Sequence, residues 1–310
     1  MHIASVKREP VGPFSLADDV AFNRWAADKL ASCPVDPADL IVEIDNPATL
    51  STNEKQLVLD RIQRANMAIY RIDRSSPLGK QQLRQLGKQF GLLRLDPNML
   101  ADEDGVTSLE VVQGKSLRGY IPYTNNRLQW HTDGYYNVDE RRIQAFILHC
   151  VRPALDGGEN ALLDPEIVYL YMRKENPEYI QAFMKDTAMT IPANTESGSE
   201  TRAAQAGPVF SIIASGQLHM RYTARTRSIE WATDSVTQAA RNWLTDFLAS
   251  DIPYIYKYKL GENEGLIANN VLHTRTQFEH SDDTASQRLL YRARYYDRIQ
   301  PGGELNALFK

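Results

Sequence analysis

A histidine and an aspartate two residues apart, His131 and Asp133, are the side chains in this sequence best suited to bind a metal ion. They lie in the aromatic segment WHTDGYY, residues 130–136. In an extended chain, residues i and i+2 point to the same side, so this imidazole and carboxylate can reach one ion together. Two histidines and one carboxylate with open positions form the face that holds oxygen-activating non-haem ferrous iron. The spacing therefore predicts such a site, with a third ligand from elsewhere.

His273 is the best candidate for the third ligand, because it ends an apolar run and is expected at the edge of a strand. Among the other histidines, His149 lies inside an apolar strand, where a hydrogen-bonded core histidine is commoner. His219 lies in a short strand and is a weaker alternative. His280 begins a second copy of the same spacing, but in a polar, turn-like tract where ligands would be solvated. The spacing alone is therefore weak, and its context selects the site.

A strand predicted over residues 287–296 places Arg288, Leu290, Arg292 and Arg294 on one face. At about 3.3 Å per residue, Arg288 and Arg292 would lie about 13 Å apart, which suits two separate anionic groups. A guanidinium group binds a carboxylate through two hydrogen bonds, and a buried one needs a partner. An exposed face with solvated arginines is the alternative, and the residues alone favour it.

Composition is that of an ordinary globular protein: 310 residues, 43% hydrophobic and 24% charged, allow one large domain or two smaller ones. The 35 basic and 39 acidic side chains give a net charge of -4, which argues against a nucleic-acid or anionic-membrane surface. No apolar run approaches the roughly 20 residues that span a bilayer, and the N-terminus lacks the apolar core of a signal peptide. Two cysteines, Cys33 and Cys150, make no disulfide framework, so a cytoplasmic location is expected.

The first hundred residues alternate between predicted strands and helices. Ser51 and Glu54 have the spacing of a capping box, which predicts a helix start, and residues 67–72 predict a strand. Residues 1–36 are a poor setting for regular structure and are predicted to form an N-terminal arm. Because no linker rich in glycine and serine follows, residues 37–310 are predicted to form one domain.

Further along the chain, residues 143–151 are apolar on both alternating faces, as in a strand covered on both sides. A helix begins at Asp164 and breaks at Pro177, and a well-marked amphipathic helix begins near Asp234. Residues 194–207 are rich in serine, threonine, alanine and glycine, and predict a flexible loop.

Four motifs in this order resemble the taurine dioxygenase family of ferrous iron- and 2-oxoglutarate-dependent oxygenases. They are WHTD at residues 130–133, GGENAL at 157–162, NNVLH at 269–273 and RLLYR at 288–292. The resemblance covers roughly residues 40–298. It implies a mainly β fold with flanking α-helices, built on a double-stranded β-helix or jelly-roll core.

The resemblance also implies roles for particular residues. The iron ligands of the family fall on His131, Asp133 and His273, and its arginine for the distal carboxylate of 2-oxoglutarate falls on Arg288. Asn160 stands where the family commonly has a threonine that contacts 2-oxoglutarate. The implied cofactors are Fe(II), 2-oxoglutarate and O2, and the carboxylate of Asp133 favours hydroxylation over halogenation.

The substrate is indicated by fewer residues. Arg292 matches the position that binds the substrate anion in sulfonate-using members, which implies a carboxylate, sulfonate or phosphonate. Tyr123, Tyr135 and Tyr136 could form an aromatic wall that receives an amine or quaternary ammonium group, or could simply pack the sheet. Arg221 is a further candidate for the substrate pocket.

The predicted function is hydroxylation of an unactivated C–H bond of a small anionic or zwitterionic substrate, such as an amino acid, betaine or sulfonate, with release of succinate and CO2. A zinc-dependent hydrolase using the same three ligands is one alternative, although it would need a general base and no Arg288. A non-catalytic β-helix protein, whose ligand binding would survive loss of His131, is the other. A small molecule is the expected partner, without nucleic acid or membrane, and a homo-oligomer is left open.

Overall fold

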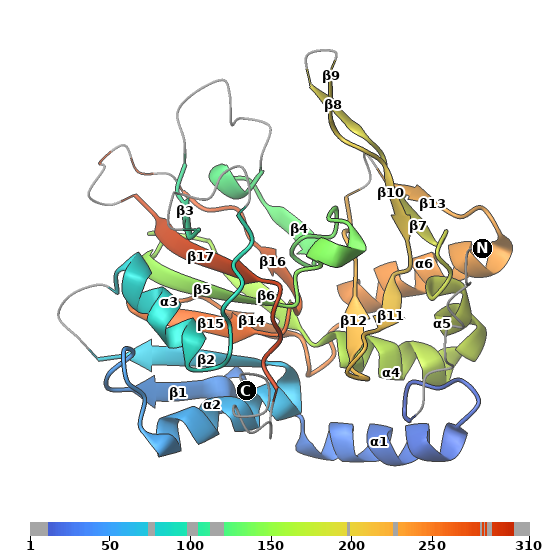
Figure 1. Cartoon of the computed structure of the whole chain (residues 1–310), viewed down its shortest axis with the longest axis horizontal. Helices are drawn as coiled ribbons and strands as arrows, with labels where there is room; N and C mark the ends of the chain where they lie inside the picture. Colours follow the sequence, from blue (N-terminus) through green and yellow to red (C-terminus); the bar gives the residue numbers. More distant parts are fainter. Residues whose placement is uncertain are drawn as a thin grey trace, which may run out of the picture. The chain divides into compact units, whose positions relative to one another are not determined.

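The structure is a computed structural model that describes residues 12–73, 78–97, 105–111, 121–196, 199–225, 229–279, 281, 283 and 287–300 (Figure 1). Its contacts divide the chain into two compact units. Unit 1 comprises Met1–Cys33, Pro165–Arg221 and Arg227–Ala249, and unit 2 comprises Pro34–Asp164, Tyr222–Thr226 and Ser250–Lys310. This division differs from the expected arm of residues 1–36 and domain of residues 37–310, which stay predictions.

Unit 2 carries most of the β-structure. Its strands are β1 (Ile41–Ile44), β2 (Met67–Ile72), β3 (Thr107–Leu109), β4 (Leu128–His131), β5 (Ala145–Arg152), β6 (Asn160–Leu163), β14 (Tyr256–Tyr258), β15 (Glu264–Ala268), β16 (Leu272–Arg275) and β17 (Leu289–Tyr295). Within the described residues they form a six-stranded sheet, in the order β1-β2-β15-β5-β17-β3, and a four-stranded sheet, in the order β14-β6-β16-β4. Strands β1 and β2 pair in parallel, whereas β5 pairs antiparallel with both of its neighbours.

Helices α2 (Thr52–Ala65) and α3 (Lys80–Lys88) pack on one face of the six-stranded sheet (Figure 1). The predicted capping box starts α2, since Ser51 Oγ accepts from the Glu54 amide at 3.2 Å and the Glu54 carboxylate accepts from the Ser51 amide at 2.6 Å. One turn apart on α2, Val58 and Ile62 enter the core. Burying each such side chain stabilises the fold by about 1.5–3 kcal/mol.

The central strand β5 and its neighbour β17 define the two faces of this sheet. Every residue of β5 except Arg152 is buried, which confirms the strand predicted to be covered on both sides. On β17, Ala293 and Tyr295 join the core under the helices. Because side chains alternate along a strand, Arg292 and Arg294 lie on the opposite face, away from α2 and α3.

Unit 1 is largely helical. Its elements are helices α1 (Asp19–Ser32), α4 (Pro165–Glu175), α5 (Pro177–Phe183) and α6 (Ser235–Ala249), and strands β7 (Met189–Ile191), β8 (Asn194–Glu196), β9 (Ser199–Arg202), β10 (Gln205–Gly207), β11 (Phe210–Ile212), β12 (Leu218–Met220) and β13 (Glu230–Trp231). The predicted break before Pro177 and the amphipathic helix α6 are confirmed. None of the helices in the described ranges has the length and apolar composition that a membrane span requires.

Two local predictions are wrong in unit 1. Helix α1 lies in the segment predicted to lack regular structure; its N-terminus is capped by Asp18, and Phe22 packs 4.1 Å from the Arg173 guanidinium. Residues 194–207, predicted to be a flexible loop, form β8, β9 and β10. Antiparallel backbone pairing between β8 and β9 makes this hairpin, and composition is a poor guide to backbone pairing.

Candidate active site

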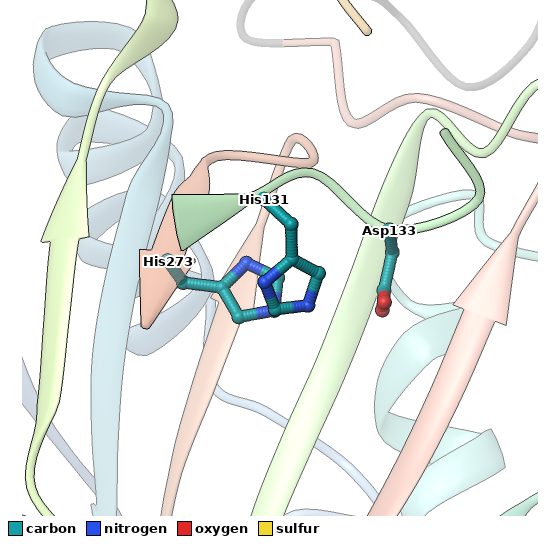
Figure 2. Close-up of side chains that lie close together, drawn as sticks. All are labelled: His131, Asp133 and His273. Atoms are coloured by element: carbon teal, nitrogen blue, oxygen red, sulfur yellow. The ribbon is translucent and has the colours of Figure 1, made fainter. Parts of the chain in front are cut away.

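His131 and His273 face each other across two paired strands. The antiparallel register of β4 and β16 places the two residues directly opposite, and their ring centroids lie 4.1 Å apart. Asp133 completes the group: one ligand atom from each of the three residues lies within 4.8 Å of the others, and all three residues are buried. Figure 2 shows both imidazoles and the carboxylate gathered at one place. The structure thus brings together the three predicted ligands, and one ion can be reached by all of them.

Backbone carbonyls orient both imidazole rings. Nδ1 of His131 lies 2.9 Å from the Gln129 carbonyl oxygen, and Nδ1 of His273 lies 3.0 Å from that of Val271. A carbonyl oxygen only accepts, so each ring donates its Nδ1 proton and keeps the lone pair on Nε2. A hydrogen bond of this kind fixes the tautomer of metal-binding histidines.

The charges of the group suit a dication. Burial lowers the pKa of His131 to about 3, assisted by the neighbouring His273, and burial also lowers the pKa of His273. Both rings are therefore neutral at neutral pH, as metal binding requires. Burial alone would raise the pKa of Asp133, but the charges of Arg292 and Arg294 outweigh it and hold that pKa well below its ordinary value. The donor set is two neutral imidazoles and one carboxylate.

Asn270 holds the backbone of Asp133 from both sides. Its Oδ1 accepts from the Asp133 amide at 2.8 Å, and its Nδ2 donates to the carbonyl oxygens of Asp133 at 3.0 Å and Ile143 at 2.8 Å. No role for Asn270 was predicted from the sequence. The signal in the sequence for a special role of this residue is the pair of asparagines before an apolar run. Asparagine tolerates the left-handed backbone conformation, which Asn270 adopts with a φ of +48°.

We expect Asn270→Gly to lower the affinity for a divalent metal by about 10- to 100-fold, as is typical for partners that orient metal ligands. Glycine keeps the positive φ and removes only the amide. Asn263→Gly is the matched control, because Asn263 also has a positive φ, of +60°, but precedes β15. Isothermal titration with Mn(II) measures both variants, and an equal loss in the two would contradict the role of the Asn270 amide.

Gly134 makes the turn that follows Asp133. Its φ is +66°, and a Cβ placed there would lie 2.4 Å from Cγ1 of Ile143. We expect Gly134→Ala to destabilise the protein by about 1–3 kcal/mol or more, from strain and overpacking together. Gly216→Ala separates the two causes, since Gly216 has a φ of +84° and nothing within 4 Å of the added atom. Urea unfolding should show the larger loss for Gly134→Ala.

The arginine face of β17 is buried at the site, so the alternative of solvated arginines is wrong. Arg292 Nη1 donates to Asp133 Oδ1 at 3.2 Å. Arg294 forms an ion pair with Asp96 and donates to the Tyr136 hydroxyl at 3.0 Å. The charges of Arg292 and Arg294 are thus balanced by the carboxylates of Asp133 and Asp96.

Arg288 lies in a separate small pocket of unit 2. The pocket is lined by Cys150, Pro153, Ala154, Gly158, Asn160, Lys259, Leu260, Arg288 and Leu290. Burial lowers the pKa of Arg288 to about 10, and the described part of the chain supplies it with no carboxylate partner. Asn160 donates from Nδ2 to the Thr274 carbonyl oxygen at 2.8 Å. A buried guanidinium group that lacks a carboxylate partner is suited to bind an anionic ligand.

The remaining predicted residues have less specific surroundings. Tyr123 is buried, and burial raises the pKa of its hydroxyl. The hydroxyl of half-buried Tyr135 lies 3.4 Å from Arg225 Nη1. Arg221 belongs to unit 1, where its guanidinium donates to the backbone carbonyl oxygens of Met189, Gln205, Gly207 and Pro208. Substrate binding by these three residues stays a prediction.

The buried group has its two histidines on paired β-strands and its aspartate in the turn after β4, and this donor set is the one found in non-haem iron oxygenases. The chain belongs to the taurine catabolism dioxygenase TauD, TfdA family, whose profile matches residues 43–294. The predicted family is therefore confirmed. Membership of this family supports the prediction of a dioxygenase that uses Fe(II), 2-oxoglutarate and O2.

Two curated relatives are uridine-5'-phosphate dioxygenases. The one from Amycolatopsis sp is 30% identical over 171 residues, which are 54% of this chain and 60% of that protein. The one from Streptomyces sp is 29% identical over 206 residues, or 64% of this chain and 72% of that protein. The chain thus matches less than two thirds of the Amycolatopsis relative.

Solved structures show the fold. Asparagine oxygenase in complex with Fe(II), 2S,3S-3-hydroxyasparagine and succinate has a TM-score of 0.56 at 15% identity, covering 83% of this chain and 93% of that one. The non-haem iron oxygenase OrfP in complex with Fe, succinate and (3S)-hydroxy-L-Arg has a TM-score of 0.58 at 17% identity, covering 80% and 81%. The predicted jelly-roll core with flanking helices is confirmed.

Proposed function

We propose that His131, Asp133 and His273 bind the ferrous ion and that the protein hydroxylates a C–H bond of a small anionic substrate, releasing succinate and CO2. The observation that carries the ligand set is Asp133 Oδ2, a buried oxygen without a hydrogen-bond partner among the described residues. A buried carboxylate oxygen costs free energy unless something binds it. A divalent cation held with the Nε2 atoms of the two histidines satisfies it.

The bound iron and 2-oxoglutarate supply the oxygen activation, and the chain supplies binding and orientation. Arg288 pairs with the distal carboxylate of 2-oxoglutarate, since its buried charge has no carboxylate partner in the described residues. Asn160 lines the same pocket and contributes a polar contact there. The backbone clamp from Asn270 keeps Asp133 in place while the co-substrates exchange.

The charge of the site supports an anionic substrate. The pairs of Arg292 with Asp133 and Arg294 with Asp96 are neutral together, and the dication and dianionic 2-oxoglutarate also cancel. Arg288 and Arg275 are buried in unit 2 and have no carboxylate partner among the described residues, so this region keeps an excess of positive charge. A phosphate on the substrate offsets this excess, as in a nucleotide such as uridine 5'-phosphate, and a zwitterionic amino acid offsets it only where its carboxylate faces the site.

Succinate release tests the proposal. The protein, loaded anaerobically with Fe(II) and 2-oxoglutarate, should develop a visible charge-transfer band. On admission of air it should release succinate with one or more compounds that carry an anionic group, from a panel of L-asparagine, L-arginine, taurine and uridine 5'-phosphate. Uridine is the uncharged control for the last of these. Zinc-dependent hydrolysis that ignores 2-oxoglutarate would contradict the proposal and support the hydrolase alternative.

We further propose that the protein acts in the cytoplasm on a small molecule, without nucleic acid or membrane as a partner. The net charge of -4 supports the absence of nucleic-acid and membrane partners, because a negatively charged protein has no overall electrostatic attraction to nucleic acid or to an anionic membrane.

A further inference from the structure

The ring of Phe278 contacts two buried guanidinium groups. The guanidinium carbon of Arg275 lies 4.8 Å from the ring centroid, and that of Arg288 lies 5.0 Å from it. All three side chains are buried. A cation over an aromatic ring is attracted by the negative face of the ring, and the attraction is strongest where water is excluded. The ring can therefore hold each guanidinium group in one orientation.

The two arginines differ in what else holds them. Arg275 donates from Nη2 to the backbone carbonyl oxygen of Thr124 at 2.8 Å and to that of Asn126. Arg173, which also lies over an aromatic ring, donates to backbone and carboxylate oxygens as well. No hydrogen bond joins the Arg288 guanidinium group to another described residue. Of these three arginines, Arg288 is the one whose orientation depends on its ring.

Two glycines allow the backbone of Phe278 to lie against the turn before β6. Gly157 and Phe278 form an antiparallel bridge, and the Gly158 amide donates to the Gln277 carbonyl oxygen at 3.3 Å. Gly157 has a φ of +68°, and a Cβ there would overlap with this carbonyl oxygen and lie 2.9 Å from the Cα of Phe278. A Cβ on Gly158 would lie 3.5 Å from Nε of Arg288. The double glycine thus brings the ring beside the arginine.

We propose that Phe278 is a positioning residue that holds the Arg288 guanidinium group at the pocket it lines, before the distal carboxylate of 2-oxoglutarate arrives. A long side chain that is already ordered loses less rotamer freedom when its ligand binds, and this raises the affinity. The ring orients the guanidinium group without occupying the N–H donors that a carboxylate needs. The inference rests on the proposed function, in which Arg288 binds 2-oxoglutarate.

The test is a titration of the anaerobic Fe(II) protein with 2-oxoglutarate, followed by the charge-transfer band. Phe278→Leu and Phe278→Met remove the ring and keep an apolar side chain, so that the position is tested even if one of them fails to fold. Phe278→Tyr keeps the ring. Phe90→Leu is the matched control, because Phe90 is 5% exposed, against 4% for Phe278, but belongs to the core that also contains residues of α2 and α3.

We expect Phe278→Leu and Phe278→Met to weaken 2-oxoglutarate binding by about tenfold, because a desolvated cation–π contact is lost. Phe278→Tyr should recover most of the affinity, and Phe90→Leu should leave it unchanged. Binding of 2-oxobutyrate, which has the 2-oxo acid group but no distal carboxylate, should be the same in Phe278→Leu and in the wild type. A general loss of structure would weaken both ligands.

A double-mutant cycle shows whether the ring acts through the arginine. In the Arg288→Gln background, Phe278→Leu should cause no further loss of 2-oxoglutarate affinity, whereas independent effects would add. Additive losses, or a wild-type affinity in Phe278→Leu and Phe278→Met, would overturn the inference.

Failure of the proposed function gives a different result in the same titrations. If Arg288→Gln itself binds 2-oxoglutarate as tightly as the wild type, Arg288 is not the arginine that binds this co-substrate, and the inference falls with that assignment. If Arg288→Gln binds weakly while both ringless variants bind normally, the function of Arg288 stands and only the positioning by Phe278 fails.

Discussion

His273→Ala should lower the affinity for Mn(II) or Fe(II) by more than about 100-fold, because it removes a direct ligand, and even outer partners of ligands contribute 10- to 100-fold. The Val271 carbonyl oxygen orients the neutral ring of His273. Among the described residues, the cluster of possible ligands consists of His131, Asp133 and His273, so another histidine cannot replace the lost one. Release of succinate should be lost with the metal. Anaerobic titration measures the affinity, and circular dichroism verifies that the variant folds.

His219→Ala is the matched control for that experiment. His219 is also buried in a β-strand, β12, but it belongs to unit 1. Its replacement should leave the metal affinity of the folded protein unchanged. Comparable losses in the two variants would mean that the His-Asp-His group is not the metal site.

Arg288→Gln should weaken 2-oxoglutarate binding by roughly 30-fold or more, since truncating one side of a buried charge pair costs about 2–5 kcal/mol and each 1.4 kcal/mol is tenfold. Metal affinity should be retained, because Arg288 lies outside the metal cluster. The charge-transfer band of the anaerobic Fe(II) protein, followed as 2-oxoglutarate is added, measures this effect.

Arg275→Gln offers a close comparison. Arg275 is buried like Arg288, and the guanidinium groups of both lie over the Phe278 ring, at 4.8 Å and 5.0 Å. Arg275, however, donates to the backbone carbonyl oxygens of Thr124 and Asn126. Its loss should therefore reduce stability and leave 2-oxoglutarate affinity nearly unchanged. Equal weakening in both variants would remove Arg288 from its assigned role.

Local signals in the sequence predict a substantial part of this fold. The capping box of Ser51 and Glu54 marks α2, the apolar run at residues 143–151 marks β5, and the strand predicted at residues 67–72 is β2. These elements are set by neighbours within a few residues. His149 also has its expected core position, with Nδ1 3.1 Å from the Tyr70 hydroxyl.

The features that the sequence did not reveal depend on residues far apart in the chain. His131 and Asp133 were found by their spacing, but the clamp by Asn270 and the pairing of Arg292 with Asp133 exist only in the folded chain. Predicting that Arg288 is buried and Arg292 partly buried likewise required tertiary structure, since the residues alone favoured solvated side chains. Helix α1 was missed because its stability comes from packing rather than from an amphipathic pattern.

With His131 and His273 as the proposed iron ligands, their direct opposition would make iron binding depend on the register of β4 and β16. A slip of β16 by one residue would turn His273 to the other face of the sheet. A chain with that error would lack one histidine nitrogen and would hold iron poorly. The metal would then add its binding free energy only to chains in the native register.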